Sequence, residues 1–284
     1  MATTTPPPAT AINPRALPAL LTWLLAAVVL VLIVALIVVK FVRGTTPPGA
    51  VVVTPADPTV VAAATSVPTA ALVAAAAAPT PVPLQEFTPR PGQPLLTASV
   101  GSHRLPEVLY VGSEYCPACA AERWALVVAL SRFGTFHHLG ATTSSPTATP
   151  GPIDSFSFSG ATYTSTSLAF HGYELYGATA DALGAYPALD HLGGADARAV
   201  RRLAPHGMVL ALVSLANQAV LEGSQYSPTV LVGRSRAVVA GALGDPTSAA
   251  TVAILASADH LTTELCRLTA ETPASVCHPD PQER

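Results

Sequence analysis

Charged side chains are scarce in this chain: only 11% of its 284 residues are Asp, Glu, Lys or Arg, and the formal net charge is −3. There is a single lysine, Lys40, and the arginines are scattered rather than clustered. A protein that holds nucleic acid by its phosphates needs a basic face. This chain has none, so we expect no nucleic-acid partner.

Cysteine is also rare, and its four copies form two close pairs, Cys116 with Cys119 and Cys266 with Cys277. In the cytosol such pairs suggest metal binding or catalysis, whereas outside the cytosol disulfides are expected. Half of the chain is hydrophobic, but much of that fraction is alanine in its first third. The core should therefore come from residues after about 95, which are enough for one well-buried domain.

A strongly apolar run without a charged residue covers residues 16–39, 24 residues that include LLTWLLAAVVLVLIVALIVV. A helix of this length spans the hydrocarbon core of a bilayer. A cleaved signal peptide would have a shorter apolar region and a small-residue cleavage site, and a core helix rarely runs this long without a polar position. We predict a disordered N-terminus at residues 1–15 and a transmembrane helix at residues 16–42.

The flanking charges and the following segment disagree on the orientation of this helix. Arg15 and the N-terminus precede it, whereas Lys40 and Arg43 follow it, which slightly favours a cytosolic C-terminus. Residues 43–94 are rich in Pro, Ala and Thr, as in stalks that tether exported domains. The two cysteine pairs also favour a location outside the cytosol, where disulfides are expected. We therefore expect a single-pass protein of the cell membrane with residues 95–278 outside the cytosol, after a disordered linker at 43–94.

Apolar runs and turn residues predict alternating strands and helices in the later part of the chain. The predicted elements are a buried strand at 107–111, a central helix from 117 to 134, strands at 137–143 and a hairpin within 155–170, short helices in 177–206, strands at 209–215 and 218–225 joined at Asn217, and helices from 236 to 268 with a break at 245–246. A six-residue tail follows at 279–284.

The sharpest motif is Cys116-Pro117-Ala118-Cys119, between an apolar strand and a helix. Free N–H groups and the positive end of the helix dipole stabilise an anion at a helix N-terminus. A thiol there has a lowered pKa, and the thiolate is the attacking species. We expect Cys116 to lie exposed at the cap and Cys119 to lie one turn inside, as a redox-active pair.

Three residues near the pair are candidates for supporting roles. Glu122 follows Cys119 by three residues on the same helical face, so it is a candidate proton acceptor, although a solvated or capping role is the more frequent one. Tyr115 and Pro117 flank Cys116 and are candidate substrate contacts.

A proline in a cis peptide beside the thiols is a usual part of thioredoxin-like sites. Pro228 is the candidate by residue type, and it is also a candidate substrate contact. Alternatively this position falls near Ala211, and the proline is absent. The sequence leaves both alternatives open.

The second pair, Cys266 and Cys277, has ten residues between its members. A structural disulfide that ties down the last helix is the preferred interpretation. A zinc site would require all four thiolates to converge, and the second spacing is loose for it. A relay of oxidising equivalents to the first pair has no support in the sequence. We expect no metal and no cofactor.

The runs VGSEYCPACAAERWALVVALSRFGTF and SFSFSGATYTS, with softer matches in LANQAVLEGSQYSP and LTTELCRLTAETPASVC, resemble the domain of unknown function 929 family. The resemblance covers about residues 95–278 and implies a thioredoxin-like fold in a membrane-associated protein. It also implies a redox pair at Cys116 and Cys119 and pairing of Cys266 with Cys277. The family tends to have a proline before the position of Asn217, where this chain has Ala211.

These observations predict an α/β protein with a thioredoxin-like central sheet flanked by helices. The expected function is a membrane-tethered thiol–disulfide oxidoreductase of exported proteins, recharged by a membrane redox partner. The alternative is a metal-binding or assembly module of the same shape that uses the two thiols without turnover. Intact Cys116 and Cys119 favour the enzyme.

Overall fold

The computed structural model describes residues 25–34, 53–78 and 82–279. Residues 51–284 form one unit and residues 1–50 another. The long strand β4 (His103–Gly112) lies inside the main sheet, with β10 (Leu212–Leu215) antiparallel and β9 (Ala169–Glu174) parallel to it. The run of apolar residues in β4 suits a strand that is buried on both faces, and the strand predicted at 107–111 is confirmed.

Three short strands complete this sheet. Its order is β2 (Thr88–Pro89), β11 (Ala219–Glu222), β10, β4 and β3 (Thr97–Val100), with β9 also paired to β4. Strands β10 and β11 are joined by a tight turn in which Ala216 and Asn217 have positive φ angles of 49° and 62°. The sequence prediction of two strands joined at Asn217 is confirmed.

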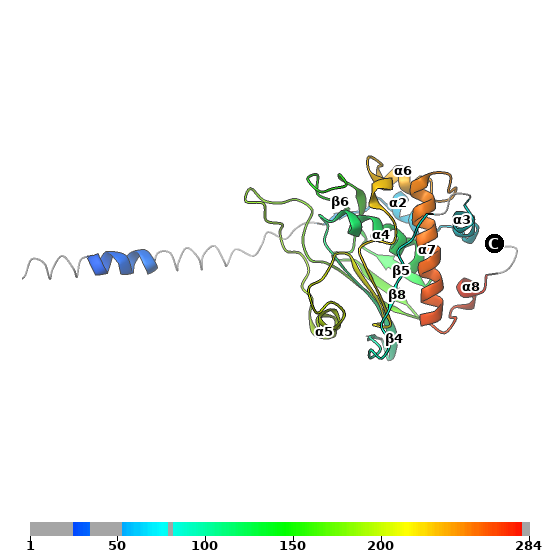
Figure 1. Ribbon diagram of the computed structural model, residues 1–284, viewed down its shortest axis with the longest axis horizontal. Coiled ribbons are helices and arrows are strands. Elements are labelled where there is room, and N and C mark those ends of the chain that lie inside the picture. The colour runs from blue at the N-terminus through cyan, green and yellow to red at the C-terminus, as the bar shows by residue number, and fades with distance from the viewer. Residues whose placement is uncertain (1–24, 35–52, 79–81, 280–284) are drawn as a thin grey trace, which may run out of the picture. The chain divides into compact units, whose positions relative to one another are not determined.

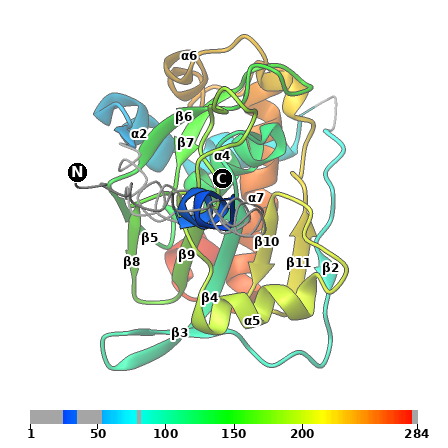
Figure 2. The ribbon, with the colours of Figure 1, turned by 90° about the vertical axis from the view of Figure 1, so that its left-hand side faces the viewer.

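Helices cover both faces of the sheet. Val108 and Tyr110 belong to the larger core with α4 (Pro117–Leu130) and α7 (Ala249–Leu268). The alternate residues Leu109 and Val111 pack in a second core with α5 (Gly194–Leu203). Figure 2 shows α5 in front of the sheet and α7 behind it. The chain is therefore a mixed α/β protein whose sheet is a middle layer.

Helix α4 is the most buried element of the larger core. Pro117 fits its first position, where the missing N–H is no loss, and nearly all later residues of the helix are buried. The indole Nε1 of Trp124 donates to the carbonyl oxygen of Asp154 at 3.0 Å. The predicted central helix is confirmed, but it ends at Leu130 rather than at 134. Strand β5 (Gly134–His137) begins at that residue instead.

The predicted hairpin within 155–170 is wrong in its pairing. Strand β7 (Asp154–Ser157) pairs with β6 (Gly140–Thr143), which also pairs with β1 (Thr54–Pro55), and β8 (Thr162–Ser165) pairs with β5. Alternating residues identify which face of a strand is buried, but they do not identify its partner.

Residues 53–78 and 82–94 are not the disordered linker that their composition suggested. They form β1, α2 (Pro58–Thr65), α3 (Thr69–Ala76) and β2 within the folded unit. Asp57 caps α2 by accepting from the N–H of Thr59 at 2.8 Å, and Val60 and Leu72 are among the buried residues. Small alanines let these helices pack closely, and α3 lies beside α7 (Figure 1).

The remaining elements agree with the sequence prediction in part. Helix α6 (Arg236–Gly241) and α7 flank the predicted break at 245–246, and α8 (Ala274–Cys277) follows. In residues 177–206, however, α5 is the one helix, and the rest is loop. Several short helices were predicted here, but Gly and Pro interrupt helical hydrogen bonding throughout the rest of this stretch.

The described part of the predicted membrane segment is an apolar helix at Leu25–Val34. Within the ranges that the structure describes, no single helix is both long and apolar enough to cross a membrane. Helices α2 and α3 reach that length only as a pair, which is bent by 68°. The predicted N-terminus at 1–15, the rest of 16–42 and the tail residues 280–284 lie outside the described residues.

Leu72 tests whether α3 belongs to the folded unit. Its side chain is 1% exposed, whereas that of the neighbouring Val73 is 38% exposed. We expect Leu72→Ala to lower the free energy of unfolding by about 2–5 kcal/mol, because it leaves a cavity. Val73→Ala should change it by no more than about 0.5 kcal/mol. Urea unfolding measures both, and equal midpoints for the two variants would contradict the packing of α3.

Candidate functional site

Cys116 and Cys119 lie where β4 leads into α4, and they form a disulfide with a Cα–Cα distance of 5.2 Å. Cys116 is the N-cap of α4, and its Sγ accepts a hydrogen bond from the backbone N–H of Cys119 at 3.1 Å. The sulfur therefore faces the unpaired N–H groups at the start of a helix. This arrangement stabilises negative charge on Cys116 when the disulfide is reduced.

Cys116 is less exposed than we expected from the sequence. It is 7% exposed, and Cys119 is fully buried. The prediction that Cys116 lies exposed at the cap is therefore wrong. The loops around the pair account for this difference. Tyr115 stacks on Tyr186 at 4.3 Å between ring centroids, and the Tyr115 carbonyl accepts from Ser145. Loops that are distant in sequence therefore close around the thiols.

The candidate substrate contacts differ in their positions. Tyr115 and Pro117 are half-buried and flank Cys116, as expected. Pro228 instead begins a short 3-10 helix, Pro228–Leu231. The peptide bond between Leu210 and Ala211 is cis. Ala211 immediately precedes Leu212, which pairs with Val111 near the end of β4. Of the two alternatives, Pro228 and the position near Ala211, the second therefore lies beside the strand that leads to Cys116, and it has the cis bond.

Glu122 is completely buried on α4, three residues after Cys119. Burial raises the pKa of its carboxyl to about 7, although the N–H of Gln225 donates to Oε2 at 2.9 Å and favours the charged form. The other oxygen, Oε1, has no hydrogen-bond partner among the described residues. Glu122 can therefore bind or release a proton near neutral pH, and it is not the solvated residue of the alternative interpretation.

Arg123 forms a buried ion pair that sequence reasoning missed. Its Nη1 lies 2.9 Å from both carboxylate oxygens of Glu174 on β9 and 3.2 Å from the Tyr110 hydroxyl oxygen. Both ionic side chains are fully buried. Burial raises the pKa of Glu174 to about 7 against the opposing effect of Arg123.

A signal for this ion pair was present in the sequence. The predicted helix was apolar on nearly all faces, so the charges at Glu122 and Arg123 had to lie inside the protein. A buried charge requires a partner or a shifted pKa. The partner Glu174 could not be identified, because it lies 51 residues further along the chain.

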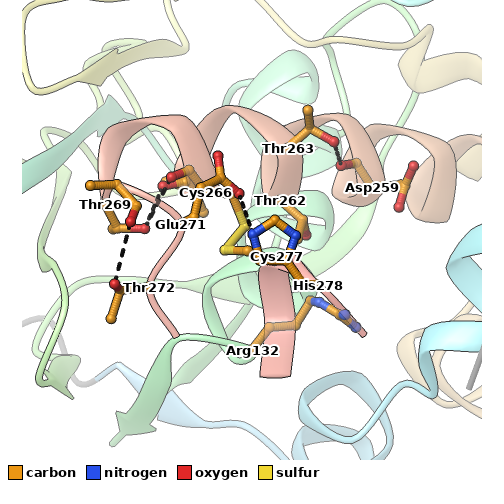
Figure 3. Close-up of a disulfide and its surroundings, with 12 residues drawn as sticks. Arg132, Asp259, Thr262, Thr263, Cys266, Thr269, Glu271, Thr272, Cys277 and His278 are labelled. Carbon is orange, nitrogen blue, oxygen red and sulfur yellow. Dashed lines mark hydrogen bonds and ion pairs between the residues drawn. A yellow bond between two sulfur atoms is a disulfide. The ribbon is translucent and has the colours of Figure 1, made fainter. Parts of the chain in front are cut away.

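Cys266 and Cys277 form the second disulfide, with a Cα–Cα distance of 5.5 Å. Figure 3 shows it joining the end of α7 to α8, near Glu271 and Arg132. Both cysteines and Arg132 line a pocket of about 340 Å³. This disulfide anchors the C-terminal segment, as expected from the sequence.

The two cysteine pairs lie near opposite ends of α4. Cys116 caps its N-terminus, whereas Arg132, just beyond its C-terminus, lines the pocket at Cys266. A helix of 14 residues is about 21 Å long. The four sulfurs therefore do not converge on one zinc ion, and direct exchange between the pairs is not possible in this conformation.

Comparison with known proteins adds one finding. The family model described as domain of unknown function (DUF929) matches residues 97–205. This range includes Cys116, Cys119, Glu122 and Glu174, whereas Cys266 and Cys277 lie beyond it. No curated protein matches the chain, and no solved structure matches it. The resemblance seen in the sequence is confirmed over the matched residues.

The buried carboxyl of Glu122 predicts how stability depends on pH. Its folded-state pKa of about 7 lies above the ordinary value, so folding favours its protonated form. The contribution of Glu122 to the free energy of unfolding is fully present below about pH 4.5. As the pH rises towards 7 this contribution is lost, by up to about 1.4 kcal/mol per pH unit. We expect Glu122→Gln, which stays neutral, to remove this contribution.

Urea unfolding between pH 4.5 and 7.5 measures the effect. Asp245→Asn is the matched control, because Asp245 is exposed and the change also replaces a carboxylate with an amide. The control should keep the pH dependence of the unaltered chain. If Glu122→Gln keeps it too, the carboxyl does not titrate as inferred.

Proposed function

We propose that this chain, whose residues 97–205 match the DUF929 family, is a thiol–disulfide oxidoreductase that acts through Cys116 and Cys119. The observation that carries the proposal is the position of Cys116 Sγ, which caps α4, accepts the N–H of Cys119 and is bonded to the Cys119 sulfur. A disulfide at a helix N-terminus is the arrangement that favours a stable thiolate after reduction.

The first step is attack by the reduced pair on a client disulfide. The Cys116 thiolate forms a bond to one client sulfur, and the client S–S bond breaks. The other client sulfur leaves as a thiolate and takes up a proton. The N–H of Cys119, 3.1 Å from Sγ in the oxidised protein, and the helix dipole favour the anionic form of Cys116.

The second step releases the client. Cys119 loses its proton, and its thiolate attacks Cys116 Sγ and breaks the mixed disulfide. The client leaves as a second thiolate that becomes protonated. In total the client disulfide gains two electrons from the Cys116–Cys119 pair, which becomes a disulfide, and two protons, one matched by the proton that Cys119 releases and the other supplied by the solvent. The reverse sequence oxidises a client dithiol.

Glu122 accepts the proton that Cys119 releases. It lies three residues after Cys119 on the same face of α4, and its pKa of about 7 allows it to change charge at neutral pH. Its Oε1 has no hydrogen-bond partner among the described residues, so it is available to hold this proton. Because Cys119 is fully buried, bulk water has little access to its proton, which favours a buried acceptor on the same helix.

The surface around Cys116 determines which clients reach it. Tyr115 and Pro117 flank the sulfur and provide contacts for an extended client segment, and Tyr186 supports Tyr115 by ring stacking. Tyr176 lies beside Tyr115, with a centroid distance of 6.5 Å, and its side chain is exposed. Aromatic rings of this kind bind apolar and backbone surfaces of unfolded segments.

The fold and location that belong to this proposal are thioredoxin-like and extracytosolic. The strand–Cys116–α4 unit, with α4 packed on the sheet, supports the fold. Two closed disulfides support an oxidising compartment. A tether through residues 16–42 would place the domain near exported clients and a membrane redox partner that recharges the pair.

Replacing Cys119 tests the exchange mechanism. We expect Cys119→Ala to accumulate mixed disulfides through Cys116, because the attack proceeds and the release step is lost. Cys116→Ala is the matched control and should trap no client. Non-reducing gels and mass spectrometry of the full-length chain, expressed in its native host, measure the adducts.

Other outcomes distinguish the alternative function. Equal adduct levels in both variants, or none in either, would exclude the exchange mechanism. A reduced chain that binds stoichiometric copper or zinc through Cys116 and Cys119, without turnover on insulin, would support the metal-binding module instead.

The proton-accepting role of Glu122 predicts a separate kinetic effect. Glu122→Gln should slow the release step at pH 7 at least about tenfold, because the amide cannot accept a proton. The attack by Cys116 should keep its rate. A coloured thiol attached to Cys116 reports the release step by stopped flow, and an unchanged release rate in the variant would rule out this role.

A further inference from the structure

A second cluster of reactive side chains lies on the opposite face of the sheet from the thiol pair. Glu107 on β4 shares its face with Leu109 and Val111, and His171 is on β9, the parallel neighbour of β4. Asp196 comes from the first turn of α5, which covers this face. Residues far apart in the sequence thus meet between two strands and a helix.

The spacing of their polar atoms is that of a coordination site. His171 Nδ1 lies 2.9 Å from Glu107 Oε1 and 3.2 Å from Asp196 Oδ2. One ligand atom from each residue lies within 4.8 Å of the other two. Ligands about 2.1 Å from a metal ion are about 3.0–3.4 Å apart in octahedral or tetrahedral geometry. One ion can therefore contact all three residues with small adjustments.

One of these atoms is buried without a hydrogen bond. Glu107 Oε1 accepts none among the described residues, and the Glu107 side chain is 2% exposed. Nδ1 carries at most one hydrogen, and the hydrogen bond with acceptable geometry goes to Asp196. A single proton on Nδ1 therefore leaves the Glu107 oxygen unsatisfied, whereas a cation between the three atoms would satisfy both carboxylates.

The cluster is open to solvent on one side. The His171 side chain is 48% exposed, and with Tyr173 it lines a cavity of about 460 Å³ between β3, β8 and β9. Of the three residues, His171 lines this cavity, so an ion and the water that completes its coordination can approach the cluster from the His171 side. A metal site with three protein ligands and an open position is typical of reactive rather than purely structural centres.

We propose that Glu107, His171 and Asp196 bind a divalent transition-metal ion of the zinc class. One imidazole nitrogen and two carboxylate oxygens form a mixed ligand set that zinc accepts, whereas magnesium and calcium prefer oxygen alone. The site is separate from the thiol pair and does not depend on the proposed oxidoreductase function.

The charges around this position favour a cation. The carboxylates of Glu107 and Asp196 face the same nitrogen of His171. The Tyr173 hydroxyl, on the same strand as His171, donates to Asp196 Oδ2 at 2.7 Å and contributes no charge. The negative charge of the two carboxylates attracts a metal ion, which would bind Nδ1 in place of any proton on it.

The experiment uses the full-length chain, treated with chelator and kept with both disulfides closed so that no thiolate is available. Zinc chloride is the probe, followed by calorimetry and by metal analysis after desalting. We expect one zinc per chain. His171→Ala should weaken binding at least about 100-fold and Asp196→Asn at least about tenfold, because each removes a ligand. His206→Ala, at an exposed histidine outside the cluster, should bind zinc as the unaltered chain does.

A second measurement separates loss of binding from loss of folding. Zinc should raise the melting temperature of the unaltered chain and of His206→Ala but not that of His171→Ala, which should unfold cooperatively without metal. The proposal is overturned by a folded, unaltered chain that binds no zinc, by equal affinity in His171→Ala, or by binding that appears only after the disulfides are reduced.

Discussion

The burial of α4 on all sides is the constraint on which the rest of this structure depends. Its apolar residues pack against the sheet and α7, and its N-terminus lies where β4 ends. Because the helix cannot move without disturbing both layers, the N–H groups at its start have a fixed direction. Cys116 Sγ accepts one of them, and the cis bond at Ala211 lies near the adjacent strand end. The thiol chemistry that we propose follows from this fixed position.

The same burial determines the state of the charges on α4. A helix without a solvent face has to place Glu122 and Arg123 inside the protein, and the two residues are accommodated differently. Arg123 is paired with Glu174, between α4 and the sheet, so its charge is compensated. Glu122 accepts the backbone N–H of Gln225, and no ion pair among the described residues includes it, so burial raises its pKa to about 7. An uncompensated carboxyl is poorly suited to stability but well suited to proton transfer.

The folded unit contains three separate regions with different chemistry. The Cys116–Cys119 pair lies at one end of α4, and the second disulfide lies near the other end, where it holds the last helix. The Glu107–His171–Asp196 cluster belongs to the α5 face. Redox exchange, anchoring of the chain end and the proposed metal binding can therefore be altered one at a time by mutation.

Features that depend on neighbouring residues could be predicted from the sequence. Cys-Pro-Ala-Cys between an apolar run and a helical pattern located the site, and the pattern around Asn217 located a hairpin, because caps and turns depend on local backbone geometry. Features that depend on distant partners follow only from the folded chain. These features are the pairing of β7 and β8 with earlier strands, the packing of α3 on α7 and of α2 on α6, the loops around Cys116, and the contact between His171 and Asp196. Side-chain alternation and composition indicate which surfaces are buried, but they do not identify the distant segment that covers each surface.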